Sequence, residues 1–420
     1  MRQNPAMTLW SGRVGTPLDP AVWELLRGED SELLPYDCEA TADHAARLHG
    51  AGLLAADELA EVEGRLAEIA LDPSAILEAD EDVHSAIERL LGPLGPKIHA
   101  GRSRNDQVAA AFRLYVADAC AEAREEIDAL ALVTLSFAET EADTLMPGYT
   151  HLQRGQPVTL GHHLLAWVEM LDRDRTRFAA AHEAARPSPL GAGALAGSTL
   201  GIDPPTGQMA NSIDAVADRD FALDYLYAAA MLHQHLSRMG EEIVLWATAE
   251  FGFVKLPEAA STGSSMMPQK LNPDVAELVR GKAGTTIGRL TGLLATLKGL
   301  PLAYDRDLQE DKGPVFAARR DVRLSLQGMT VLVSGLEANR ERLAAAAADP
   351  LLLATDVAEE LVKGGIPFRQ AHEQVAASVR DGSYRPTGSA AESVAARVAP
   401  GPGDVASAIA VARSRFGGGR

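Results

Sequence analysis

The spacing of prolines is the feature that most restricts the fold of this 420-residue chain. Long proline-free spans cover residues 103–146, 158–186, 206–256, 274–300 and 315–349. Because proline costs about 3 kcal/mol inside a helix, these spans are where long helices can form. They are rich in Ala, Leu, Glu, Arg and Met, and strand-like alternation is nearly absent. We therefore predict an all-α fold.

One span shows helical periodicity over most of its length. Between Asp106 and Glu141, apolar residues recur at a four-three spacing. A helix of about 36 residues is about 54 Å long. Several such rods with broad apolar faces cannot be covered within one compact monomer, so we expect an elongated bundle of long helices that is shared between subunits. Two smaller helical domains flank it, giving predicted domains 1–102, 103–349 and 350–420.

Charge and cysteine content exclude several classes of function. The chain has 39 Lys and Arg against 58 Asp and Glu, a net charge of −19. Nucleic acid is therefore not an expected partner, because its binding depends on clustered cations, and an anionic membrane surface is disfavoured for the same reason. No apolar stretch reaches the ~18 residues of a membrane-spanning helix, and residues 1–13 lack the apolar core of a signal peptide. Cys38 and Cys120 are isolated in sequence, so we predict buried, reduced thiols and a cytoplasmic protein.

Three motif-like patterns do not qualify as sites. Residues 191–197 read G-x-G-x-x-x-G, which departs from the dinucleotide fingerprint and follows no strand. Gly281-Lys282 lacks the rest of a phosphate-binding loop. His233 and His235 point in different directions on a helix, so we interpret them as packing or surface residues. The sequence predicts neither a metal nor a cofactor.

Polar segments at the ends of the predicted helices carry the candidate chemistry. Residues 100–107 (AGRSRNDQ) place two arginines and an amide before a long helix. They can clamp a carboxylate, or Ser103 or Asn105 can cap the helix, and both roles are compatible. In the Gly/Pro-punctuated loop 147–153, His151 follows Thr150 and either transfers protons or has a structural role.

Two further segments, residues 261–273 and 304–312, each precede a predicted helix and contain charged and amide side chains. Residues 261–273 resemble a mobile lid, in which Lys270 and Asn272 can stabilise an oxyanion and a serine can act as a base if a cation or dipole stabilises it. A flexible linker is the alternative. Glu277, one turn into the next helix, can orient a histidine. Residues 304–312 (YDRDLQEDK) bind substrate or form a solvated helix start. Together these segments predict a polyanionic substrate, proton abstraction beside a carboxylate, and elimination.

The same residues resemble the argininosuccinate lyase family of the fumarase/aspartase superfamily. The likeness runs through most of the chain and includes GRSRNDQV from Gly101, PGYTHLQRGQP from Pro147, TGSSMMPQKLNPD from Thr262, and LKGLPLAYDRDLQEDK from Leu297. The serine loop is typical of the superfamily, whereas GRSRNDQ and DLQEDK are typical of this branch.

The resemblance implies a homotetramer whose active sites are each assembled from three subunits. It implies anti β-elimination of a C–N bond, giving arginine and fumarate without metal or cofactor. Ser264, rather than Ser265, corresponds to the base, and His151 with Glu277 assists proton donation or anchors the substrate. Lys270 and Asn272 correspond to residues that stabilise the aci-carboxylate intermediate. The remaining substrate-binding positions implied are Arg104, Asn105, Thr150, Tyr304, Gln309 and Lys312.

The chain also departs from the family pattern. An Asn-x-Ser turn whose serine contacts substrate is expected before Tyr36-Asp37, but residues 25–30 read LLRGED. Leu271 replaces a second lysine of the mobile loop, and Ile87 replaces an Asn. A related lyase that releases fumarate from another N-substituted aspartate is therefore an alternative. A non-catalytic relative is a third, which the retained Ser264 and His151 argue against.

Overall fold

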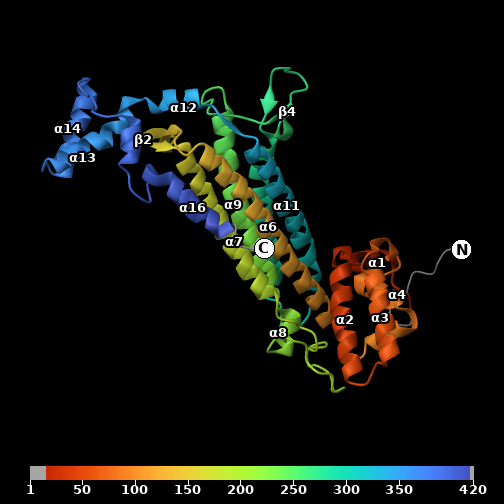
Figure 1. The fold of residues 1–420 in the computed structure, drawn as a ribbon. Coiled ribbons are helices and arrows are strands. Elements are labelled where there is room, and N and C mark those ends of the chain that lie inside the picture. The colour runs from red at the N-terminus through yellow and green to blue at the C-terminus, as the bar shows by residue number, and fades with distance from the viewer. Residues whose placement is uncertain (1–15, 417–420) are drawn as a thin grey trace. The chain divides into compact units, whose positions relative to one another are not determined.

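The computed structural model describes residues 16–416 and is built mainly from helices (Figure 1). The prediction of an all-α fold is confirmed. The first helices are α1 (Pro20–Leu26), α2 (Leu34–Gly50), α3 (Ala56–Ile69), α4 (Val83–Leu90) and α5 (Gly95–Ile98). The long helices are α6 (Arg104–Thr140), α7 (Leu160–Ala185), α9 (Asp220–Ala247), α10 (Asp274–Leu297) and α11 (Lys312–Ser334), and the short α8 (Ser212–Ala217) lies between α7 and α9 in the chain. The last are α12 (Arg340–Ala347), α13 (Ala354–Lys363), α14 (Phe368–Asp381), α15 (Ala390–Ala395) and α16 (Val405–Phe416).

Three small two-stranded antiparallel sheets contain the strands of the described chain. They pair β1 (Leu145–Thr150) with β2 (Gln153–Thr159), β3 (Val254–Lys255) with β6 (Glu337–Ala338), and β4 (Thr262–Gly263) with β5 (Leu271–Asn272). None of the helices in residues 16–416 is long and apolar enough to cross a membrane. The segment 1–13, where no signal peptide is expected, lies outside the described residues.

The chain divides into two compact units. Unit 1 contains residues up to 124, 177–230 and 285–321, and unit 2 contains residues 125–176, 231–284 and 322 onwards. The five long helices contribute residues to both units, whereas α1–α5 and α8 belong to unit 1 and α12–α16 to unit 2. The domain boundaries expected at 102 and 349 stay a prediction.

Aromatic packing on α6 forms the core of unit 1. The Phe112 ring lies edge-on to Phe221 of α9 and to Phe316 of α11, with ring centroids 5.3 and 6.4 Å apart. All three rings are buried, and burying one such side chain contributes about 1.5–3 kcal/mol. Cys38 and Cys120 are free, buried thiols, as predicted.

Close helix contacts organise the core of unit 2. A Cβ on Gly161 of α7 would lie 2.6 Å from the Ala138 carbonyl oxygen of α6, so only glycine allows this approach. His233 and His235 on α9 are buried, where His235 Nδ1 lies 2.7 Å from an Asp174 carboxylate oxygen and His233 Nε2 lies 3.1 Å from Ser325 Oγ. Their interpretation as packing residues is confirmed.

The segment around His151 differs from the expected loop. It forms the β1–β2 hairpin, in which Pro147 faces Pro157 and the register shifts between Pro147 and Tyr149. A proline has no N–H to donate to the hydrogen-bond ladder of a sheet. Prolines in strands are therefore found at irregular positions of this kind. The two-residue turn is His151-Leu152, and both have left-handed φ angles, 55° and 56°. Asn or Gly normally marks such a turn, so the sequence lacks the usual hairpin signal.

Candidate active site

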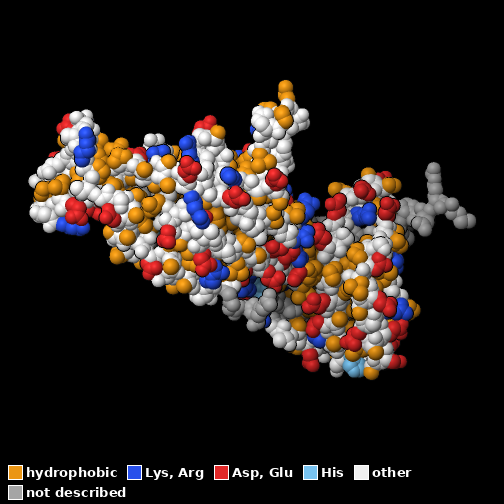
Figure 2. Space-filling view, turned by 45° about the horizontal axis from the view of Figure 1, so that its top comes forward, with side chains coloured by type: hydrophobic (Ala, Val, Ile, Leu, Met, Phe, Trp, Pro, Cys, Tyr) orange, Lys and Arg blue, Asp and Glu red, His pale blue; other side chains and the backbone are white. Residues whose placement is uncertain are grey.

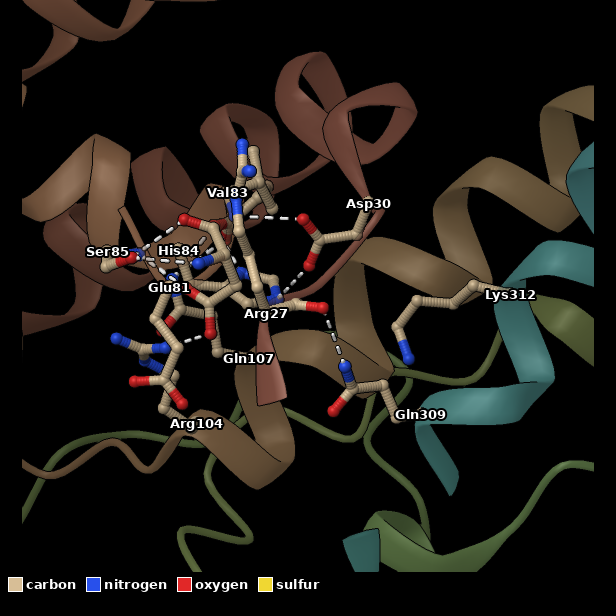
Figure 3. Close-up of polar contacts among 12 residues, drawn as sticks. Arg27, Asp30, Glu81, Val83, His84, Ser85, Arg104, Gln107, Gln309 and Lys312 are labelled. Atoms are coloured by element: carbon tan, nitrogen blue, oxygen red, sulfur yellow. Dashed lines mark hydrogen bonds and ion pairs between the residues drawn. The ribbon is translucent and has the colours of Figure 1, made fainter. Parts of the chain in front are cut away.

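A cavity of about 860 Å³ in unit 1 is the candidate site. Its wall includes five of the predicted substrate-binding residues: Arg104, Asn105, Tyr304, Gln309 and Lys312. They come from the start of α6 and from the segment that leads into α11. Figure 3 shows Gln309 and Lys312 on one side of this region, His84 and Arg104 on the other, and Asp30 between them. The cavity is thus built from segments far apart in the sequence.

The first turn of α6 combines capping with substrate-facing groups. Ser103 Oγ accepts the Asn105 N–H at 3.3 Å, and the Ser103 N–H donates to the Asp106 carboxylate at 2.9 Å, which together form a capping box. The buried Asp106 also accepts the N–H groups of Gly191 and Gly193, at 3.1 and 2.9 Å. The glycine-rich segment 191–197 therefore helps to position α6. The predicted cap agrees with this geometry, whereas of the two arginines only Arg104 lines the cavity, and the carboxylate clamp stays a prediction.

Arg104 is held against the N-terminus of α4. Its guanidinium pairs with the Asp82 carboxylate, and Asp82 caps α4 by accepting the Ser85 N–H at 2.8 Å. Arg104 and Asp82 both line the cavity. The cap thereby fixes the carboxylate that orients Arg104.

A buried cluster centred on His84 forms the wall behind these residues (Figure 3). His84 Nδ1 lies 2.7 Å from an Asp37 carboxylate oxygen, and His84 Nε2 lies 4.0 Å from Asp30. Gln107 donates its amide to both Asp37 oxygens, at 3.0 and 2.9 Å. Asp30 in turn accepts the Val83 N–H at 3.0 Å. Asp30 and His84 reach the cavity wall, whereas Asp37 lies behind it.

The ionisation of this cluster follows from its packing. Burial alone would lower the pKa of His84, but the charges of Asp37, Asp82 and Asp30 together raise it above its ordinary value. Burial would raise the pKa of Asp37, yet the His84 and Arg102 charges and the Gln107 hydrogen bonds lower it. For Asp30, burial is the largest effect and raises its pKa. His84 and Asp37 are therefore best described as a charged pair.

Lys312 is also anchored inside unit 1. Its ammonium donates to Asp311 at 2.8 Å and to the Leu308 carbonyl at 3.3 Å, and its side chain is only 7% exposed. Asp311 also pairs with the buried Arg219. The cation therefore has a defined position at the cavity wall.

The predicted base lies in unit 2, at the tip of the β4–β5 hairpin. Ser264 Oγ accepts the backbone N–H groups of Met266 and Met267, at 3.3 and 3.0 Å. Lys270 is exposed, and the Asn272 amide contacts the Gly263 carbonyl at 3.4 Å. Met266 is 88% exposed, and Figure 2 shows hydrophobic side chains at the end of this projecting loop. The tip thus presents apolar surface around a serine oxygen that two N–H groups polarise.

The other predicted residues of unit 2 lie elsewhere. Thr150 and His151 are exposed at the β1–β2 turn, and Glu277 in the first turn of α10 lies 3.8 Å from Arg280. Within residues 16–416, no hydrogen bond or ion pair joins His151 to Glu277 or to Ser264. The single chain therefore brings together the predicted substrate-binding residues of unit 1, but not the predicted catalytic set.

Several wall residues had no role in the sequence analysis. Outside the segments 25–30 and 304–312 that the sequence analysis named, they are Glu32, Glu81, Asp82, His84 and Arg320. The sequence signal near them is the acidic run 78–82 that precedes His84. This run does not indicate a shared wall, because the wall depends on contacts across more than 200 residues.

Comparisons with known proteins agree on the family. A family model described as "Lyase" matches residues 29–288, and one described as "Argininosuccinate lyase C-terminal" matches residues 351–393. The chain is 52% identical over 390 residues to an argininosuccinate lyase of Frankia casuarinae, covering 88% of this chain and 83% of that protein. It is 46% identical over 398 residues to the argininosuccinate lyase of Streptomyces griseus, covering 90% and 84%.

Solved structures support the same fold. An EDDS lyase in complex with formate matches with a TM-score of 0.78 at 27% identity, covering 94% of this chain and 88% of that one. A class II fumarase from Schistosoma mansoni matches with a TM-score of 0.71 at 16% identity, covering 85% and 88%, which shows the fold alone. Taken with the identity to curated relatives over nearly nine-tenths of the sequence, these matches show that the chain belongs to the argininosuccinate lyase family of the fumarase/aspartase superfamily.

Proposed function

We propose that this protein cleaves argininosuccinate into arginine and fumarate by anti β-elimination of a C–N bond. The observation that carries this conclusion is the unit 1 cavity, whose wall combines Arg104, Asn105, Tyr304, Gln309 and Lys312. Its volume of about 860 Å³ suits a small organic molecule. Five Lys or Arg side chains, His84, and six Asp or Glu side chains line it, which suits a substrate that carries three carboxylates together with an amino group and a guanidinium.

The reaction begins with loss of a proton from carbon. In the proposed mechanism, Ser264 removes the Cβ proton of the succinyl half, and the electron pair moves into the adjacent carboxylate to form an aci-carboxylate. The two N–H groups that donate to Ser264 Oγ support this role, because such donors stabilise negative charge on the oxygen. Lys270 and Asn272 stabilise the aci-carboxylate.

Elimination then breaks the bond to nitrogen. As the electrons return, the Cα–Cβ double bond forms and the C–N bond breaks, which releases fumarate. His151, oriented by Glu277, assists proton donation to the departing guanidinium nitrogen or anchors the substrate. Arg104, Asn105 and Thr150 hold the succinyl half, and Tyr304, Gln309 and Lys312 complete the binding site. No metal or cofactor takes part in this scheme.

These groups act together in a homotetramer, with each site assembled from three subunits. The support is an exposed face of α10 that carries Leu278 and Ile287, 67% and 46% exposed. Around them, Gly281, Gly284 and Gly288 leave open space where a Cβ would stand. A face of exposed apolar and small residues is typical of a subunit interface, where it allows another helix to approach closely. A second copy of the chain is therefore the proposed occupant.

The proposed place of the reaction is arginine biosynthesis in the cytoplasm. Cys38 and Cys120 are both buried and unbridged, which agrees with a reducing compartment. Localisation of a fluorescently tagged chain in its native host tests the compartment, and membrane or extracellular signal would contradict it.

Ultraviolet absorbance of fumarate tests the activity. Purified protein mixed with argininosuccinate should produce fumarate, and Ser264→Ala should lower kcat by about 10²–10⁴-fold. The neighbouring Ser265→Ala is the matched control and should remain within about threefold of the unmodified protein. Light scattering should show the same assembly for all three proteins. No turnover by the unmodified protein would reject the substrate, and a defect in Ser265→Ala alone would reject Ser264 as the base.

A related lyase for another N-substituted aspartate is the second candidate. The observation that favours it is that residues 25–30, which depart from the family pattern, all line the cavity. Comparison of kcat/KM across a panel of N-succinyl amines separates the two proposals. Argininosuccinate should rank first, and a last place for it would favour the alternative.

A further inference from the structure

The segment that replaces the expected Asn-x-Ser turn is held firmly at the cavity wall. Gln309 donates its amide to the carbonyls of Leu26 and Arg27, both at 3.2 Å (Figure 3). Arg306 donates to the Leu26 carbonyl at 2.6 Å, and the Gly28 N–H donates to the Glu81 carbonyl at 2.8 Å. The backbone at Arg27 is therefore positioned by residues of the same wall, while its side chain is left out of these contacts.

Most cations of the wall already have anionic partners. Arg104 pairs with Asp82, Arg306 with Glu81 at 3.1 Å, and Lys312 with Asp311. Their charges are therefore largely balanced without a ligand.

Arg27 differs from those three. Within residues 16–416, its guanidinium makes no ion pair or hydrogen bond with another side chain or with the backbone, and the residue is half-buried beside the cavity. Arg320 of α11 is also unpaired among the described residues, but it is exposed. A half-buried guanidinium has lost part of its hydration, and a carboxylate with two oxygens is its best-matched partner. Figure 3 shows the Arg27 carbonyl facing the Gln309 amide, with the side chain of Arg27 extending away from Gln309 and Lys312.

We propose that Arg27 is a specificity-determining residue whose guanidinium binds the α-carboxylate on the arginine half of argininosuccinate. This inference rests on the proposed function. The substrate has three carboxylates, and the proposed mechanism provides Lys270, Asn272, Arg104 and Asn105 for the two of the succinyl half. Of the other cations on the wall, Lys312 is paired with Asp311 and Arg306 with Glu81. Arg27 is half-buried and has no such partner among residues 16–416, so it is the cation left for the third carboxylate. Arg27 thereby takes over substrate recognition in a segment that lacks the serine typical of the family.

Inhibition by two compounds that differ only in this carboxylate tests the assignment. Arginine has the α-carboxylate, and agmatine is the same molecule without it. The unmodified enzyme should be inhibited more strongly by arginine than by agmatine. In Arg27→Gln, KM for argininosuccinate should rise by about 10- to 100-fold with little change in kcat, and the preference for arginine over agmatine should fall to near one. Arg27→Lys should retain part of the preference, because it keeps the charge but loses the two-pronged geometry.

Two controls make the outcomes distinct. Arg65→Ala removes an arginine that pairs with Glu61 on α3 and does not line the cavity, so KM and inhibition should be unchanged. Inhibition by fumarate should be the same in Arg27→Gln as in the unmodified enzyme. An unchanged arginine preference in Arg27→Gln, or weaker inhibition by fumarate instead, would overturn the inference while leaving the proposed function intact. Failure of the unmodified enzyme to release fumarate would remove the proposed function and the inference with it.

Discussion

Replacing His84 by leucine should destabilise the folded protein by about 3 kcal/mol. The substitution leaves Asp37 as a fully buried carboxylate without its closest cation, and breaking a buried pair in this way typically costs about 3–5 kcal/mol. We expect the lower end of that range because Gln107 still donates to both Asp37 oxygens and Thr41 donates at 3.2 Å. Arg102 also lowers the pKa of Asp37 through its charge.

The loss should depend on pH in a defined direction. The folded-state pKa of His84 is raised, so its contribution is fully present below its ordinary value of about 6.5 and disappears as the pH rises through the raised value. The pKa of Asp37 is lowered, so its contribution is present above about pH 3.9 and is lost as the pH falls through the lowered value. The difference between the unmodified protein and His84→Leu should therefore be largest between about pH 4 and 6.5.

Urea unfolding followed by circular dichroism, at matched subunit concentration, measures this difference. The double variant Asp37→Leu/His84→Leu should be less destabilised than the sum of the two single variants, because it leaves no unpaired buried charge. A His84→Leu protein within about 0.5 kcal/mol of the unmodified one at pH 6, or additive single variants, would refute the charged pair.

Two further predictions concern packing and assembly. Gly161→Ala should lower the free energy of unfolding by about 1–3 kcal/mol, because the new Cβ would lie 2.6 Å from the Ala138 carbonyl oxygen. Gly64→Ala is the control, because a Cβ there would have no atom within 4 Å. It should be neutral or stabilising in the same urea titration. Leu278→Asp should dissociate the proposed tetramer, because it buries an unpaired charge in the proposed α10 interface. Leu71→Asp, at a leucine that is 85% exposed in the single chain and far from α10 in sequence, should not. Sedimentation velocity distinguishes these outcomes, and an intact Leu278→Asp tetramer would exclude this face as the interface.

The long helices could be predicted from proline spacing, because a proline disrupts the helix in which it lies whatever the rest of the chain does. The expected helix 106–141 is α6, Arg104–Thr140, and α10 fits between Pro273 and Pro301. The proline-free span 315–349 does not form one helix. It contains α11 from its fourth residue onwards and a second helix, α12. The break falls at Gly335, where a Cβ would stand 2.5 Å from Pro257, a contact that spacing alone does not reveal.

The site could be predicted only in part. Five substrate-binding residues of unit 1 were assigned through family resemblance, and the structure places them around one cavity. The pair of His84 with Asp37 was missed because it joins residues 47 positions apart in two different helices. The β1–β2 hairpin was missed because its strands contain prolines and its turn contains neither Asn nor Gly. The roles of Ser264 and His151 stay predictions, because no hydrogen bond or ion pair joins these two residues within residues 16–416.

Proton NMR of the reverse reaction in deuterated water tests the elimination chemistry most directly. Arginine and fumarate incubated with the enzyme should give argininosuccinate with a single deuterium at Cβ, always on the same face, because one enzyme base delivers it opposite the incoming nitrogen. Ser265→Ala should give the same product, and Ser264→Ala should give almost none. Deuterium on both faces, or stereospecific labelling that persists at full rate in Ser264→Ala, would contradict the account.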